Sequence, residues 1–186
     1  MNATISVKSG ATPSATPSAT PGAMLEAVLL HHEINQINAA YAAVLDERRF
    51  AEWPDFFVPE GRYRVQAREN HDRGLPLCLM DLESQGMMKD RVHGITQTIY
   101  HGPYYTRHVV GAALLLPAHE GQEARAVLRS QTHYAVFRTK PGGVSEVFSV
   151  GRYLDEWVRT GAGLKLQSRH CVYDSEMILN SLIYPI

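Results

Sequence analysis

Four long runs of strand-type sequence in the second half of the chain constrain its fold most strongly. They span residues 107–116, 124–139, 144–159 and 164 to about 180. The breaks between them are short and rich in turn-forming residues: Pro117 with Gly121, KPGG at 140–143 and TGAG at 160–163. Long neighbouring strands joined by short turns predict an antiparallel meander.

The first half of the chain predicts helices that would cover such a sheet. From residue 23 to about residue 48, apolar residues recur at spacings of three and four, as in an amphipathic helix. The segment RRFAEWPDFF then places aromatic residues at helical spacing, and Pro54 suits the first turn of a short helix. Residues 77–95 return to helical spacing despite Gly86, which predicts a third helix.

One strand is expected between these helices. GRYRVQAR, residues 61–68, alternates between an apolar face with Tyr63, Val65 and Ala67 and a second face. The second face is polar and strongly basic, with Arg62, Arg64, Gln66 and Arg68. The residues ENHDRGLP that follow predict a loop. Helices first and strands afterwards indicate an α+β fold, with helices packed on one face of a long, bent, mainly antiparallel sheet.

The 186 residues fit a single domain preceded by a tail. Residues 1–22 contain the near-repeat ATPS-ATPS-ATPG and predict a disordered segment, so the domain is expected to span residues 23–186. Neither a signal peptide nor a run of about 18 apolar residues is present, and we expect a cytoplasmic protein without membrane contact. The net charge of −1 makes nucleic acid an unexpected partner.

Metal and cofactor sites have little support in the sequence. His101 and His108 could meet Asp90 in a two-histidine, one-carboxylate iron site, but hydrogen-bonding histidines are the more frequent case. Cys78 and Cys171 lack the CxxC or CxH neighbours of a thiolate metal site or an iron–sulfur cluster. We therefore expect two free thiols, no metal ligand and no cofactor in this chain.

An acid–base pocket is an alternative that the residues leave open. Cone-shaped α+β folds often hold a pocket between helices and sheet, and general bases and proton donors are available here. They are Tyr63, Tyr105, His133, Tyr134, Asp155 and His170. However, Arg129, Gln131 and His133 share one strand face, which predicts an exposed or partner-facing stripe. A self-contained isomerase or dehydratase and a plain dimerisation module both remain possible. The phosphate loop, GxSxG and HExxH motifs are absent.

Three segments carry a resemblance to a known family. They are RYRVQARENHDRGLPLCLMDLES, MMKDRVHGITQTIYHGPYYTRHVVG and CVYDSEMILNSLIYPI. They resemble the β subunits of aromatic-ring-hydroxylating oxygenases from about residue 34 to residue 186, including the WPDFF corner. Within that family the chain is most similar to the small subunits of salicylate 5-hydroxylases, with the terephthalate dioxygenase small subunits more distant.

The resemblance implies a cystatin-like or NTF2-like cone that acts as a non-catalytic structural β subunit. A large α subunit would carry the Rieske [2Fe–2S] cluster and the mononuclear non-haem Fe(II), and the two chains would form an α3β3 hexamer. Electrons would come from NADH through a reductase and a ferredoxin. The complex would hydroxylate an aromatic carboxylate, with salicylate to gentisate as the expected reaction, and the isolated chain would be inactive.

The contacts with the α subunit are expected in three places. These are the basic strand face with Arg62, Arg64 and Arg68, the 91–108 region with Arg91, Arg107 and His108, and the terminal Tyr184, Pro185 and Ile186. A solvated strand face is the alternative for the arginines. The apolar LIYPI segment would fray unless something buries it.

Overall fold

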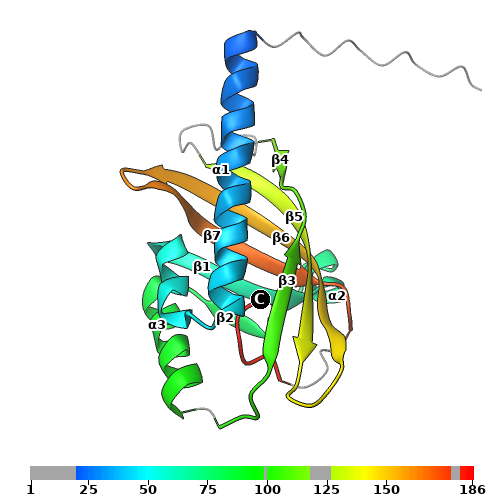
Figure 1. Ribbon diagram of the computed structural model, residues 1–186. Coiled ribbons are helices and arrows are strands. Elements are labelled where there is room, and N and C mark those ends of the chain that lie inside the picture. The colour runs from blue at the N-terminus through cyan, green and yellow to red at the C-terminus, as the bar shows by residue number, and fades with distance from the viewer. Residues whose placement is uncertain (1–19, 99, 118–126, 177–180) are drawn as a thin grey trace, which may run out of the picture.

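The computed structural model describes residues 20–98, 100–117, 127–176 and 181–186. A seven-stranded sheet forms its framework, in the order β2-β1-β7-β6-β5-β3, with β4 paired to β5. Helix α1, Pro21–Asp46, lies across one face of this strongly curled sheet, and the chain ends beside that helix (Figure 1). The α+β prediction is confirmed. Among the described residues, no helix combines the length and the apolar character needed to cross a membrane.

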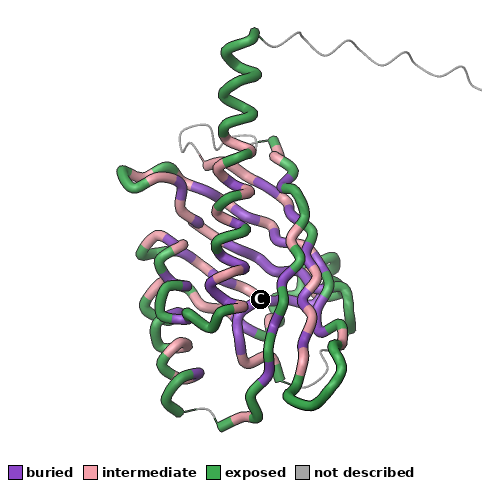
Figure 2. Tube along the Cα trace, viewed as in Figure 1, coloured by how far each residue is buried: buried purple, intermediate pink, exposed green. Residues whose placement is uncertain are grey.

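Helix α1 has a packed half and a projecting half. The Thr20 side chain accepts the Ala23 N–H at 3.4 Å, and Pro21 occupies the first turn. Every residue from Thr20 to Leu29 is exposed, and the buried face begins at Ile34 (Figure 2). The predicted helix is confirmed, although it starts within the predicted tail. Residues 1–19 of that tail lie outside the described residues.

The aromatic corner after α1 forms as predicted. A short helix, η1, spans Phe50–Phe56, and strand β1 follows directly at Phe57–Ala67. The Trp53 side chain is fully buried, donates a hydrogen bond to the Tyr41 hydroxyl at 3.0 Å and packs edge-on against Tyr63. The corner therefore anchors α1 to the first strand of the sheet.

The segment after β1 corrects two predictions. Residues expected in a loop begin with a short helix, α2, at Arg68–Asp72, so Arg68 is not part of the strand. The helix predicted at 77–95 is wrong in its first part, because Met80–Leu82 form strand β2 and pair with β1. Helix α3 covers only Gln85–His93, since the Ser84 side chain caps it by accepting the Met87 N–H, and η2 continues it at Gly94–Thr98.

The predicted meander is confirmed in its centre and corrected at its ends. Strands β5, Leu128–Thr139, β6, Ser145–Thr160, and β7, Gly163–Tyr173, pair antiparallel in sequence order. The run 107–116 divides into β3, Tyr105–Val110, and β4, Leu114–Leu116. The last run ends at Tyr173, and residues 124–126 and 177–180 of the predicted runs lie outside the described residues. Strand β1 joins β7 in parallel, so the sheet is mixed.

Candidate functional site

The interior of the cone holds a buried ion pair. Asp155 and Arg169 are cross-strand neighbours on β6 and β7, joined by hydrogen bonds of 2.9 and 2.8 Å, and neither side chain is exposed. Arg169 also donates to the Asn38 side chain, and its guanidinium lies 4.2 and 4.3 Å from the ring centroids of Tyr41 and Tyr153. Burial raises the pKa of Asp155, and Arg169 opposes that rise. The Asp155 carboxylate and the Arg169 guanidinium therefore bind each other in the protein interior.

Of the six candidate acid–base groups, only Asp155 and His170 line a common cavity, a small one of about 100 Å³, and the other four are not among its lining residues. Tyr63, Tyr134 and Asp155 lie in the packed interior, and the Tyr134 hydroxyl is bonded to Ser149 at 3.2 Å. Arg129, Gln131 and His133 share the outward face of β5, as predicted, but only His133 is exposed, and Arg129 is half-buried and lines that cavity. Tyr105 is exposed on β3, whereas His170, which pairs with Arg64 across β7 and β1, is buried.

The end of the chain is buried by this chain itself. Ile186 is 1 % exposed, and its main-chain oxygen accepts hydrogen bonds from the Tyr41 and Tyr63 hydroxyls at 3.2 and 3.0 Å. Its N–H donates to the Tyr63 hydroxyl at 2.9 Å. Arg91 reinforces this arrangement, because it donates to the main-chain oxygens of Leu182 and Ile183. The last three residues of the LIYPI segment are therefore buried in the chain's own core, and a contact of these residues with the α subunit stays a prediction.

The two histidines considered as iron ligands, His101 and His108, form hydrogen bonds with different partners. The His101 ring bonds the Tyr184 hydroxyl at 2.7 Å, and Tyr184 packs against Tyr104 at a centroid distance of 4.4 Å. His108 bonds the Asp46 carboxylate through its ring, at 2.6 Å, and through its main-chain N–H, at 2.9 Å. Asp90 is exposed. Across the part of the chain that the structure describes, no three His, Cys, Asp or Glu side chains come together as a metal site requires.

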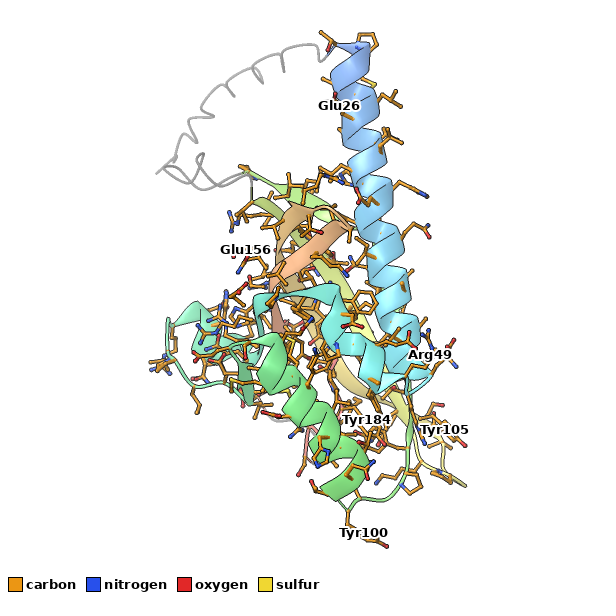
Figure 3. The ribbon with its side chains drawn as sticks, turned by 90° about the vertical axis from the view of Figure 1, so that its left-hand side faces the viewer. Glu26, Arg49, Tyr100, Tyr105, Glu156 and Tyr184 are labelled. Atoms are coloured by element: carbon orange, nitrogen blue, oxygen red, sulfur yellow. The ribbon has the colours of Figure 1, made fainter. Side chains whose placement is uncertain are left out.

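The basic strand face lies on the side of the sheet away from α1, the side on which Glu156 is seen in Figure 3. Arg62 forms a bidentate pair with Asp81, at 2.8 and 2.6 Å. Arg64 lines a small cavity of about 100 Å³ beside His170. Burial, followed by the charge of Arg64, lowers the pKa of His170 to about 4, so this ring is neutral at pH 7.

The residues predicted to contact the α subunit differ in their exposure to solvent. Arg68 and Arg107 are exposed and Arg62 and Arg64 half-buried, with Arg107 only loosely paired to Asp46 at 3.8 Å. The other members have their contacts within this chain: Arg91, half-buried, and His108, Tyr184, Pro185 and Ile186, buried. Which of them touches another chain stays a prediction.

Comparison with known proteins places this geometry in a family. The family model of the SnoaL-like domain matches residues 26–170. The β2 subunit of the terminal oxygenase component of terephthalate 1,2-dioxygenase, from Comamonas sp, is 32 % identical over 154 residues, covering 83 % of this chain and 97 % of that protein. The chain belongs to the small subunits of aromatic-ring-hydroxylating dioxygenases.

Two further relatives agree with this family. The anthranilate 1,2-dioxygenase small subunit of Burkholderia cepacia is 28 % identical to this chain. The match covers 83 % of this chain and 92 % of the Burkholderia protein. A crystal structure of a β subunit assigned to an aromatic-ring-hydroxylating dioxygenase of Novosphingobium aromaticivorans is 32 % identical and superposes with a TM-score of 0.76. It covers 87 % of this chain and 99 % of that one. The predicted NTF2-like cone is confirmed as a SnoaL-like fold.

Proposed function

We propose that this dioxygenase small subunit is a non-catalytic, structural β subunit of a cytoplasmic Rieske non-haem iron oxygenase. The observation that supports this most is the filled interior, where Asp155 is fully buried against Arg169. A self-contained isomerase or dehydratase would need an acid or base that its substrate can reach. The packed interior therefore disfavours the alternative.

The metal centres would belong to the large α subunit. A Rieske cluster needs two cysteines and two histidines. Cys171 is fully buried on β7, and its thiol donates to the Ile186 main-chain oxygen at 3.5 Å, while Cys78 lies in the loop before β2. The cysteines of this chain do not fit the cluster, so electrons from NADH, delivered by a reductase and a ferredoxin, would pass only through α subunits.

The role left for the β subunit is assembly. A ring of three α subunits requires repeated, self-consistent interfaces, which three identical scaffold chains can supply in an α3β3 hexamer. Of the residues predicted at these contacts, Arg62, Arg64, Arg68 and Arg107 present polar groups to the outside. The buried members would act indirectly, by fixing the shape of the contact surface.

The substrate would be an aromatic carboxylate. The names of the two curated relatives specify anthranilate and terephthalate, both of which carry a carboxylate on the ring. Within this class we propose salicylate as substrate and gentisate as product. In that reaction O₂ supplies one oxygen atom to the ring, and two electrons from NADH reduce the other to water.

The test is reconstitution with the large subunit, reductase, ferredoxin, NADH and isotopically labelled O₂, offering salicylate, anthranilate and terephthalate in parallel. We expect gentisate with one labelled oxygen from salicylate and no product from the small subunit alone. A product with two labelled oxygens from another acid would replace salicylate as substrate but keep the scaffold role. Turnover by the small subunit alone would refute that role.

A further inference from the structure

An apolar patch covers the outward face of the sheet where β3, β5 and β6 pair. The strand register places Val109, Ala135 and Val150 in one cross-strand row and Phe137 and Val147 in the next. Val109 is 57 % exposed, Val147 53 % and Val150 39 %. Because pairing residues on one face are direct neighbours, these side chains form a continuous surface.

The charges within this surface are positive. Arg107 shares the row of Phe137 and Val147, its side chain is 76 % exposed, and its nearest carboxylate, Asp46, already bonds His108. Tyr105, 60 % exposed, extends the surface toward the lower end of α1 (Figure 3), and the Arg48 guanidinium lies 5.0 Å from the centroid of its ring.

We call this surface the β3–β5–β6 patch: Tyr105, Arg107, Val109, Ala135, Phe137, Val147 and Val150. Helices α1 and α3 lie on the opposite side of the sheet (Figure 1). A contiguous apolar patch on a soluble protein marks an interaction surface, and permanent partners bury the most apolar surfaces.

The positive charges of Arg107 and Arg48 favour a different protein over a second copy of this chain as the partner that covers the patch. A second copy packed face to face would repeat the same contacts about a two-fold axis and bring Arg107 and Arg48 of each copy toward one positive surface. Like charges enclosed in an interface oppose binding. A partner with an apolar surface and carboxylates opposite the arginines would pair with the patch instead.

We propose that the β3–β5–β6 patch is the docking surface for the large oxygenase subunit, whose matching surface is apolar and carries a carboxylate opposite Arg107. This inference rests on the proposed function. It differs from the residue set expected from sequence, because the apolar side chains supply the contact area and Arg107 the orientation.

The chain offers a matched control for a test. Val109 on the patch and Val28 on the projecting half of α1 are 57 % and 58 % exposed, so Val109→Asp and Val28→Asp introduce the same charge at the same exposure. The full chain, tagged, is co-expressed with its large subunit, and the recovered large subunit is quantified. Circular dichroism and thermal melting of each isolated variant show whether it folds, and Arg107→Glu, at an exposed side chain, provides a second patch variant.

The patch variants Val109→Asp and Arg107→Glu are expected to recover at least about tenfold less large subunit, and Val28→Asp the wild-type amount. Wild-type recovery by folded Val109→Asp and Arg107→Glu would overturn the docking surface and leave the proposed function intact. Equal loss in Val28→Asp would also overturn it. A homodimer of the isolated chain that Val109→Asp dissociates would assign the patch to a second copy. Failure of the wild-type chain to recover any large subunit would instead refute the proposed function.

Discussion

Replacing Asp155 by asparagine should destabilise the small subunit strongly. Asp155→Asn keeps the size of the side chain but removes the negative charge that faces Arg169, and both side chains are fully enclosed. The arginine would remain charged in the interior, held only by Asn38 and the rings of Tyr41 and Tyr153. Such a charge without its counter-ion is the costly state of a buried pair.

The expected loss is about 3–5 kcal/mol of the free energy of unfolding. With a denaturant slope of about 2 kcal/mol per molar urea, this shifts the unfolding midpoint down by roughly 1.5–2.5 M. The double variant Asp155→Leu/Arg169→Met removes both charges, and replacing a buried pair by apolar residues is often neutral. It should therefore recover most of the loss.

Urea unfolding followed by circular dichroism measures these changes. The control is Asp81→Asn, which breaks a second bidentate Arg–Asp pair whose side chains are 41 % and 33 % exposed. A pair in contact with water contributes at most about 1 kcal/mol. If Asp155→Asn lost no more than Asp81→Asn, the carboxylate would not be a buried counter-ion, and an accessible acid–base role for it would return.

Two further results are expected of the isolated chain. Gly151→Ala should lower the free energy of unfolding by about 1–3 kcal/mol or more, because a Cβ there would lie 2.1 Å from the Val172 main-chain oxygen; an unchanged urea midpoint would show that the strands can separate at no cost. His170 has a folded pKa of about 4, set by burial and then by Arg64, below its unfolded value of about 6.5. Protons therefore bind the unfolded chain first, and about 3 kcal/mol of stability present above pH ~6.5 should be lost as the pH falls toward ~4. Urea titrations across this range should show a smaller loss in His170→Gln, and parallel losses would contradict the assigned pKa.

Local patterns predicted the parts of the fold that depend on local chemistry. The KPGG turn separates β5 from β6 because its glycines allow a tight reversal, and Gly142 indeed has a φ of +76°. The apolar spacing of α1 predicted its packed half, from Ile34 onward. In these places the chain needs no distant partner to choose its conformation.

Local sequence patterns could not predict which distant segments pair in the sheet. Strand β2 has only three residues, Met80–Leu82, and is a strand because β1 offers it an edge. The parallel pairing of β1 with β7 joins residues more than 100 positions apart, such as Arg64 and His170, and no local pattern encodes it. Ser84 was a usable signal, since serine is a preferred helix N-cap and marks where α3 begins.

The buried network of Asn38, Asp155 and Arg169 was also not predicted, because its members come from distant segments. One signal in the sequence nevertheless pointed to it. Asn38, Asp155 and Arg169 come from α1, β6 and β7. Asp155 was a candidate acid–base group in the sequence, because its partner could not be seen. However, Arg169 alternates in register with Cys171 and Tyr173, which face the core. An arginine on the apolar side of a strand requires a buried carboxylate.

The central claim, that this chain is the scaffold subunit of a larger oxygenase, is tested most directly by one purification. The chain is co-expressed with its large subunit and isolated through a tag on this chain alone, and the mass and iron content of the product are determined. We predict an α3β3 complex that contains iron, and no iron when the large subunit is omitted. A stable monomer or dimer recovered without the large subunit, although that subunit is present and folded, would contradict the claim.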